Sequence, residues 1–248
     1  MTGTDRTPVD PEFRENRPPP QAVTVAEVEE MLGQHREWLD SKGQTGARAS
    51  FHRAMLSDAY LQGADLRGAD LSQAVLQVAE LQNANLYRAN LSQANLQNAS
   101  LQKSKLREAT LEGAHLIGAN LQEADLRKAN LMRADLRDAD LLETRLMDAD
   151  LTTAYCRAAN FFMADLRGAN CTEANLQEAD LQGADLRLTN LRLAQVQDAR
   201  LTGAEMGGAL VHAADFLDAL GLTARQASEA EADARTRWPM YLRDQMHP

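Results

Sequence analysis

Cysteines, histidines and acidic residues are the side chains of this sequence that could bind a metal ion or take part in catalysis. Cys156 and Cys171 stand where the surrounding pattern has leucine, so we interpret both as small buried hydrophobic residues. Many aspartates recur one residue before a leucine, in a regular series that is atypical of catalytic acids. The histidines are scattered without the spacing of metal ligands, at His35, His52, His115, His212 and His247.

Two further signs of catalysis are missing from the sequence. It has no phosphate-binding glycine loop and no serine in a nucleophile motif. We therefore predict that the protein is not an enzyme, that it needs no cofactor, and that it has no catalytic, cofactor-binding or metal-ligating residues.

The pattern that contains these residues is a five-residue repeat, which runs from Ala49 to Asp218 without insertion or deletion. Alanine stands at 31 of 34 equivalent positions, and leucine stands two residues later at 26 of 34. Residues five apart point in different directions around a helix, and they alternate between the faces of a straight strand. The chain must therefore turn about once per repeat to return the leucines to a shared interior. This predicts a solenoid, whose surface is suited to binding rather than to catalysis.

The individual repeats resemble a known family. Segments 64–68 (ADLRG) and 179–183 (ADLQG) are similar to the pentapeptide-repeat family, whose consensus is alanine, aspartate or asparagine, leucine and two variable residues. The resemblance implies an all-β solenoid, a right-handed four-sided β-helix in which leucine and alanine point inward and the short polar residue supports the turns. Four repeats per coil would give about 8.5 coils, stacked over about 40 Å. Alanine is replaced at Ser104, Thr144 and Thr189.

The chain before the repeats divides into two predicted parts. Residues 1–23 hold five of the seven prolines and few hydrophobic residues, which indicates a disordered tail. Residues 24–48 begin with a capping box, formed by Thr24 and Glu27, and continue with apolar residues at helical spacing until Gly43. We expect a helix over about 25–41 that caps the first coil.

The chain after the repeats, residues 219–248, contains a second capping box at Thr223 and Gln226. It predicts a C-terminal helix that continues to Trp238 and is closed by Pro239, in a segment that resembles one common in the family. This segment could cover the last coil or join two copies into a homodimer. The side chains for either contact are Leu217, Leu220, Leu222, Trp238, Met240, Tyr241 and Leu242.

With four repeats per coil, residues twenty apart should form columns along the rod. One such column is basic, with Arg88 and Lys128 beside it. The column comprises Arg67, Tyr87, Arg107, Arg127, Met147, Arg167 and Arg187. Neighbouring carboxylates could neutralise these arginines; otherwise the row would attract an anionic partner. Nucleic acid is a poor fit, because the chain carries a net charge of −10 and few aromatic residues for base stacking.

A small apolar cluster interrupts the polar columns near the middle of the rod. It consists of Leu142, Met147, Phe162 and Met163, all of which we expect to face outward. Such a cluster could form a partner-binding patch or could pack locally at a coil edge.

The sequence therefore predicts a non-catalytic protein-protein interaction module, a rigid scaffold or regulator that presents columns of side chains to another protein. Two alternatives follow from the family resemblance, which includes bacterial proteins. One is an acidic rod that imitates DNA and binds a topoisomerase such as gyrase, and the other is a bacterial effector. The sequence shows no secretory signal and no apolar stretch long enough to cross a membrane, so we expect a cytoplasmic protein. Export by a non-classical route stays open.

Overall fold

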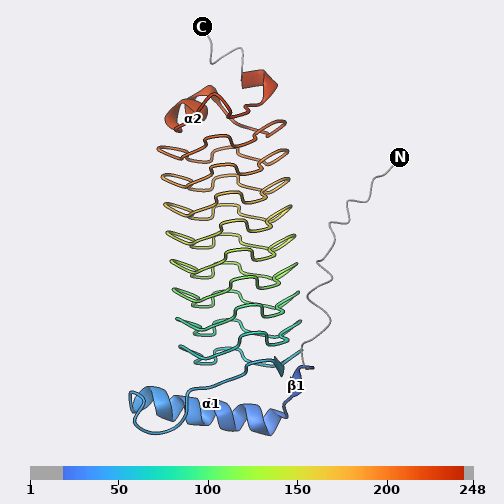
Figure 1. Ribbon diagram of the computed structural model, residues 1–248, viewed down its shortest axis with the longest axis vertical. Helices are drawn as coiled ribbons and strands as arrows, with labels where there is room; N and C mark the ends of the chain where they lie inside the picture. The colour runs from blue at the N-terminus through green and yellow to red at the C-terminus, as the bar shows by residue number, and fades with distance from the viewer. Residues whose placement is uncertain (1–18, 243–248) are drawn as a thin grey trace, which may run out of the picture.

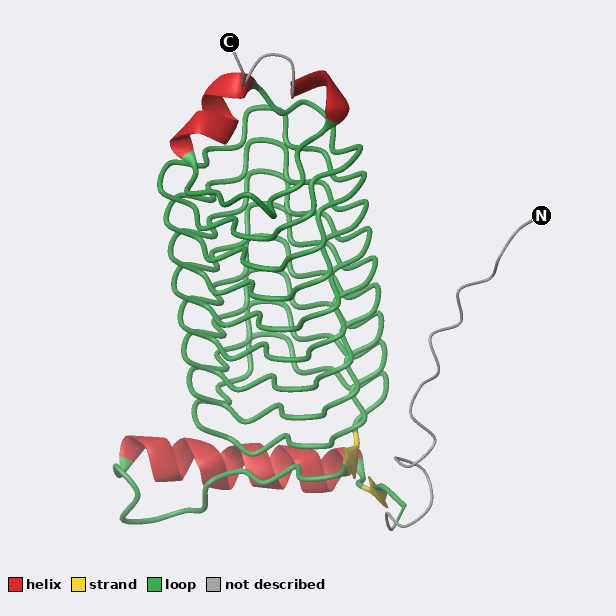
Figure 2. Ribbon diagram, turned by 45° about the horizontal axis from the view of Figure 1, so that its top comes forward, coloured by secondary structure: helices red, strands yellow, loops and turns green. Residues whose placement is uncertain are grey.

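The structure, a computed structural model, describes residues 19–242 of the chain. These residues form a rod of stacked four-sided coils with helical segments at its two ends (Figures 1 and 2). In chain order the elements are strand β1 (Gln21–Ala22), helix α1 (Val25–Asp40), strand β2 (Ala54–Met55) and helix α2 (Ala224–Glu229). Within this part of the chain, no helix has both the length and the apolar character needed to span a membrane.

Backbone hydrogen bonds between successive coils hold the rod together. The N–H of Leu66 donates to the carbonyl of Asn85, and the N–H of Asn85 donates to the carbonyl of Ala64, both at 2.8 Å. This pair of bonds recurs along the rod as parallel bridges between residues twenty apart. The repeated leucines and alanines point into the rod and form one continuous buried core. Surface side chains twenty apart consequently stack in columns, about 4.8 Å from one to the next.

Each repeat ends in a tight turn, which the residue before the leucine supports. In one such turn the N–H of Ala74 donates to the carbonyl of Leu71 at 3.1 Å, and Gln73 has a left-handed φ of 59°. The Oδ1 of Asp70 accepts a hydrogen bond from the backbone N–H of Ser72 at 3.0 Å. A short acceptor side chain is therefore useful at this position, which accounts for the frequent Asp and Asn.

Helix α1 lies across the first coil (Figure 1). Its start is held by a reciprocal capping box: the hydroxyl of Thr24 accepts from the N–H of Glu27 at 3.2 Å, and the Glu27 carboxylate accepts from the N–H of Thr24 at 2.7 Å. On the face toward the rod, His35 is buried and its Nδ1 accepts a hydrogen bond from the N–H of Ala49. The helix thus covers a coil end that would otherwise be open to solvent.

The predicted disordered tail, residues 1–23, is too long at its C-terminal end. Gln21 and Ala22 form β1, which pairs in parallel with β2 in the first coil. The N–H of Gln21 donates to the carbonyl of Arg53 at 2.8 Å. An unpaired coil edge offers backbone partners to any nearby extended segment, which explains why these residues join the rod. Residues 1–18 lie outside the described part of the chain.

The predicted C-terminal helix is wrong in length. Thr223 forms the expected capping box with Gln226, but α2 ends at Glu229 rather than continuing to Trp238. Beyond α2 the chain forms bridges to the rod at Glu231 and Arg237 with a turn between them, and residues 240–242 are helical again.

Residues 230–237 form hydrogen bonds with the last coils. The N–H of Glu231 donates to the carbonyl of Ala209 at 2.8 Å, and the N–H of Arg237 donates to the carbonyl of Ala214 at 2.9 Å. The helical propensity of the alanine-rich segment is worth only a few tenths of a kcal/mol per residue, whereas open backbone groups at the end of the rod gain hydrogen bonds by this pairing.

Candidate partner-binding face

The candidate site lies on the side of the rod that carries the predicted basic column. We call this set the arginine column: Arg67, Tyr87, Arg107, Arg127, Met147, Arg167 and Arg187. The residues two positions earlier form a second column on the same side, which we call the acidic column: Asp65, Asn85, Lys105, Asp125, Arg145, Asp165, Asp185 and Glu205. Parallel bridges join neighbouring members of the acidic column from coil to coil.

Four arginines of the arginine column are neutralised within their own repeat. Arg127 donates from Nε and Nη2 to both carboxylate oxygens of Asp125, at 2.7 and 2.6 Å. Arg67, Arg167 and Arg187 bind Asp65, Asp165 and Asp185 in the same way. These bonds hold the pKa of Asp125 and of Asp165 below the ordinary value.

At two levels of the rod this pairing fails, because a cation replaces the acidic residue. Lys105 stands there beside Arg107, and Arg145 stands beside Met147. The sequence analysis did not single out Lys105 or Arg145, although both break the series of Asp and Asn before leucine. Both side chains are exposed, and neither forms an ion pair within 4.0 Å in the part of the chain that the structure describes.

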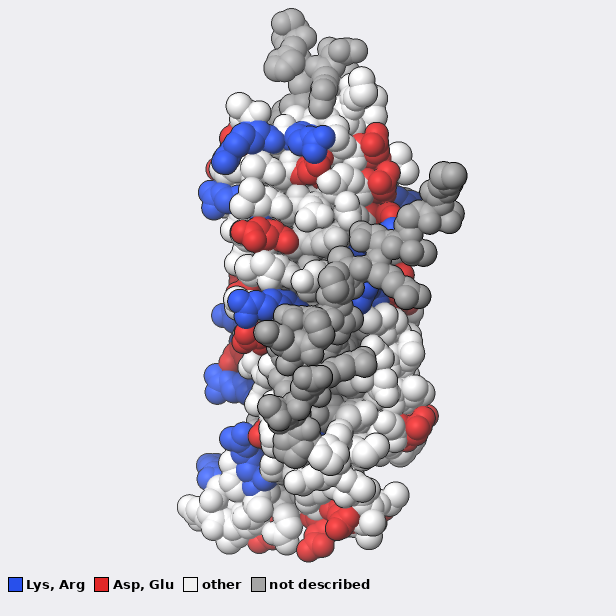
Figure 3. All heavy atoms as spheres, turned by 45° about the vertical axis from the view of Figure 1, so that its right-hand side comes forward, with Lys and Arg blue, Asp and Glu red and all other residues white. Residues whose placement is uncertain are grey.

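The two basic residues predicted beside the arginine column differ in their environment. Arg88 donates to Glu108 at 2.7 Å and lies over the ring of Tyr87, 5.0 Å from its centroid. Lys128 lies on the surface at the next corner and makes no ion pair among residues 19–242. On the face shown in Figure 3, basic side chains recur along the rod with acidic ones between them.

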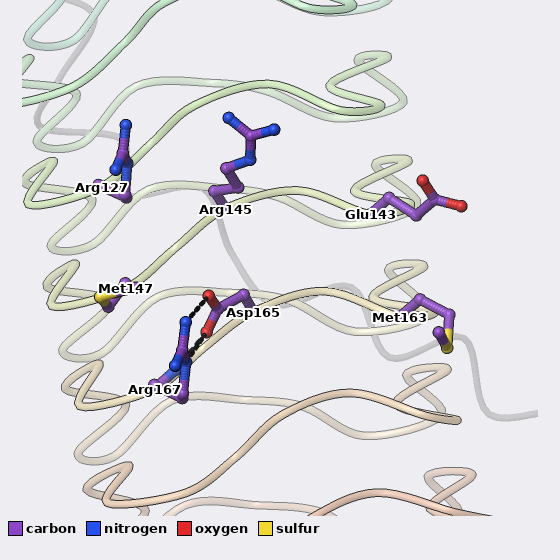
Figure 4. Close-up of a pocket in the computed structure, with 7 residues that line it drawn as sticks. All are labelled: Arg127, Glu143, Arg145, Met147, Met163, Asp165 and Arg167. Atoms are coloured by element: carbon purple, nitrogen blue, oxygen red, sulfur yellow. Dashed lines mark hydrogen bonds and ion pairs between the residues drawn. The ribbon is translucent and has the colours of Figure 1, made fainter.

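Two shallow depressions follow one another along this side of the rod. The larger, of about 660 Å³, is lined by Arg127, Glu143, Arg145, Met147, Met163, Asp165 and Arg167. In Figure 4, Asp165 is bonded to Arg167, while Arg145 stands near them without such a bond. The smaller, of about 350 Å³, is lined by Arg67, Asn85, Tyr87, Lys105, Arg107, Asp125 and Arg127. Arg127 borders both depressions, so they form one continuous face.

The predicted apolar patch is only partly exposed. The side chains of Phe162 and Met163 are 40% and 54% exposed, whereas Leu142 and Met147 are half-buried, contrary to the expectation that all four face outward. Side chains of successive coils cover one another, which shields residues within a column. Met147 and Met163 both line the larger depression. The patch therefore adjoins the uncompensated cation Arg145.

Two other exposed leucines were missed by the sequence reasoning. Leu188 and Leu193 are 70% and 49% exposed, and both occupy left-handed turn positions that do not favour leucine. Both leucines stand at the last position of a repeat, where the chain has polar residues or glycine at many levels. This departure from the pattern could have identified them from the sequence.

The predicted C-terminal contact residues fall into two groups. Leu222 and Leu242 are buried in the core, and the ring of Trp238 stacks on Phe216 with centroids 5.1 Å apart. Leu217 is half-buried. The exposed group consists of Leu220, Met240 and Tyr241. The first group covers the last coil. Tyr241 of the second group also contacts it, because its hydroxyl donates to the carbonyl of Ala219 at 2.9 Å and accepts from the N–H of Leu222 at 3.1 Å.

The remaining candidates for chemistry are dispersed or buried. Residues 19–242 contain no group of three histidine, cysteine or acidic side chains that could hold a metal ion. Cys156 and Cys171 are free thiols inside the rod, and burial raises the pKa of both. The exposed cations of this surface can pair with carboxylates, and its apolar side chains can cover apolar groups of a partner.

A protein-family model matches the repeats that build the rod. The family model described as pentapeptide repeats matches eight copies in overlapping segments, including 47–73, 74–113, 114–152 and 154–192. A search among curated proteins found no match.

Several solved structures are similar to this chain. HetL of the cyanobacterium Nostoc sp. strain PCC 7120, a pentapeptide repeat protein involved in heterocyst differentiation regulation, is 27% identical over 87% of this chain and 94% of its own, with a TM-score of 0.43. A second pentapeptide repeat protein of Nostoc PCC 7120, alr5209, is 33% identical over 58% of this chain and 84% of its own, with a TM-score of 0.30. QnrB1, a plasmid-mediated fluoroquinolone resistance protein, is 14% identical over 73% of this chain and 93% of its own, with a TM-score of 0.40.

The repeats that the family model matches extend from residue 47 to residue 192, which is more than half of the chain. These are the same repeats that build the four-sided coils. The chain therefore belongs to the pentapeptide-repeat family, and its rod is a right-handed β-helix solenoid.

Proposed function

We propose that this protein is a non-catalytic interaction module, a rigid rod that presents fixed columns of side chains to a protein partner. The observation that carries the proposal is the exposure of Phe162 and Met163 beside a depression that also contains the uncompensated Arg145. Exposed aromatic and methionine side chains next to arginines are characteristic of binding surfaces.

Rigidity favours this function. Each coil is bonded to the next through its backbone, so the side chains of a column keep their spacing without a partner. A surface organised in advance loses little conformational freedom on binding. The rod can therefore act as a scaffold or a regulator.

The DNA-mimic alternative is disfavoured by the arginine column. A rod that imitates DNA should present rows of free carboxylates to a basic groove. On this side of the rod, Asp125, Asp165 and Asp185 are bound by arginines of their own repeats. No specific contact favours the effector alternative.

The test is affinity capture from a lysate of the native organism, with wild-type protein compared with a Leu142→Asp, Phe162→Asp double variant. A Gln62→Asp, Gln82→Asp double variant makes the same charge change in the same column, three or more coils away. Thermal unfolding of all three proteins must agree before capture is compared. A protein retained by wild type and by the control, but lost by the first variant, supports the proposal. Equal retention by all three proteins, or no retained protein at all, would contradict the proposal that this surface binds a partner.

A further inference from the structure

The face between Arg67 and Arg167 has an excess of positive charge, in a chain whose net charge is −10. The two depressions along this face are lined by six cations, namely Arg67, Lys105, Arg107, Arg127, Arg145 and Arg167. Only three carboxylates line them, namely Asp125, Glu143 and Asp165. Asp65, which pairs with Arg67, adds a fourth carboxylate to this face, so six against four leaves a local excess of two positive charges, opposite in sign to the molecule as a whole.

The carboxylates next to Arg145 in the acidic column are already engaged. Asp125 and Asp165 lie one coil on either side of Arg145, joined to it by parallel bridges. Arg127 binds both oxygens of Asp125, and Arg167 binds both oxygens of Asp165. Arg145 is close enough to help lower the pKa of Asp125, after the larger effect of Arg127, but it has no ion partner of its own in the described chain.

The second uncompensated level lies two coils away. Arg107 contacts Glu108 only at 3.4 Å, while the other carboxylate oxygen of Glu108 is bound by Arg88 at 2.7 Å. Lys105 has no ion pair among residues 19–242. Lys105 and Arg107 therefore offer donors to an added anion at one level, as Arg145 does at the other.

An apolar contact is built into the same face. At the level of Arg145, Met147 replaces the arginine of the arginine column, and Met163 lines the same depression from the neighbouring corner. The sulfur of Met163 lies over Gly183, where an added Cβ would approach it to 2.5 Å. Methionine side chains are flexible and polarisable, so they adapt to apolar groups of different shape.

We propose that this face binds an acidic, extended polypeptide segment, which rests on the proposed function and names the chemistry of the partner. Carboxylates of the segment pair with Lys105, Arg107 and Arg145, and apolar side chains of the segment contact Met147 at one corner and Met163 at the next. Guanidinium groups can bind carboxylates through two parallel hydrogen bonds. From Arg67 to Arg167 the face spans five coil steps, about 24 Å, which matches about seven residues of an extended chain.

Nucleic acid fits the face less well. Binding to single strands relies on aromatic platforms for the bases, and Tyr87 is the single aromatic residue that lines the two depressions. A long polyanion would also meet the negative charge of the rest of the protein, whereas a short acidic segment can lie within the basic face.

The test begins with a phage-displayed library of random peptides, long enough to span the face, selected on the full-length protein. Enriched peptides are synthesised with a fluorescent label and measured by anisotropy. The charge-reversal variant is Lys105→Glu, Arg145→Glu. Its matched control is Arg133→Glu, Arg192→Glu, which makes the same charge change at exposed positions away from both depressions.

We expect enrichment of acidic peptides that contain apolar residues. Their affinity should fall by about tenfold or more in the charge-reversal variant, should fall with added salt, and should not change in the control. Enrichment of peptides without acidic excess, equal binding to both variants, or no enrichment would overturn the inference. Equally tight binding of a labelled single-stranded oligonucleotide would indicate nucleic acid as the ligand of this face and would also overturn the inference.

The outcomes separate this inference from the proposed function. Peptides that bind independently of Lys105 and Arg145, but are lost on Phe162→Asp, would contradict the acidic-segment inference and leave the interaction module standing. In the opposite case, the Leu142→Asp, Phe162→Asp variant captures the same proteins as wild type while acidic peptides bind this face. That result would contradict the apolar patch as the binding site and would support the acidic-segment inference.

Discussion

The Nδ1 atom of His35 accepts a hydrogen bond from the backbone N–H of Ala49 at 3.1 Å, which ties α1 to the first coil. The ring is fully buried and stacks on Trp38, with centroids 5.6 Å apart. Because Nδ1 is the acceptor, the neutral ring carries its proton on Nε2. Protonation of Nδ1 would both remove the acceptor and bury a charge.

Acid should therefore weaken the N-terminal cap. Burial lowers the pKa of His35; Asp65 opposes this shift, while Arg67 and Arg48 add to it through their charges. A histidine whose pKa is lower in the folded state stabilises it fully above its unfolded pKa of about 6.5, and this contribution is lost as the pH falls toward the folded pKa. We expect hydrogen exchange of residues 25–40 to accelerate, relative to the coils, between about pH 7.5 and about pH 5.5.

The control for this prediction is His35→Asn, because an amide oxygen can replace Nδ1 as the acceptor and does not titrate. Its exchange in residues 25–40, corrected for the intrinsic pH dependence, should stay level over the same range. Equal acid sensitivity in both proteins would assign the effect to other groups.

Ser104 stands where most repeats have alanine, and we expect it to destabilise the rod. Its hydroxyl is buried in an alanine position and has no hydrogen-bond partner in the described structure, whereas the hydroxyl of Thr189 donates to the carbonyl of Leu166 at 2.8 Å. Ser104→Ala should raise the free energy of unfolding by about 1 kcal/mol, and Thr189→Ala should lower it by about 1 kcal/mol. Urea unfolding measures both. A loss of stability in Ser104→Ala would mean that the hydroxyl is satisfied after all.

The two cysteines should be inert in the folded protein. Burial raises the pKa of Cys156 and raises that of Cys171 to about 12, so almost no thiolate is present at neutral pH. A thiol reagent should label neither residue in the native state and both in denaturant. Fast labelling of either cysteine without denaturant would show that the core opens locally at this point of the rod.

A variant of Trp238 can show whether the C-terminal segment is a cap or a dimer contact. Because its ring stacks on Phe216, Trp238→Asp should lower the melting temperature whichever role the segment has. Light scattering over a range of protein concentrations then separates the two roles. A dimer through this end predicts that wild-type mass is twice that of the variant, while a cap predicts a monomeric mass for both.

Much of the rod could be predicted from the sequence, because a repeat of five without interruption allows few structures. Burial of Leu66 or Leu126 follows from periodicity alone, since the leucines can share an interior only if the chain turns once per repeat. The turn role of residues such as Asp70 followed from the family resemblance, and the bond to the N–H of Ser72 is its physical basis.

The ends of the rod and the balance of charge on its surface depended on tertiary structure. The alanine-rich segment after Glu229 favours a helix by itself, but it pairs with the last coils because their open edge provides hydrogen bonds. The sequence by itself determined the repeat and the shared interior of the leucines, because these follow from local periodicity, whereas the inward alanines and the columns of residues twenty apart were implied by the resemblance to the family. Only the structure decided which arginines are neutralised and that Arg145 is not, since Asp125 and Asp165 of the adjacent coils bind Arg127 and Arg167 of their own repeats instead of Arg145.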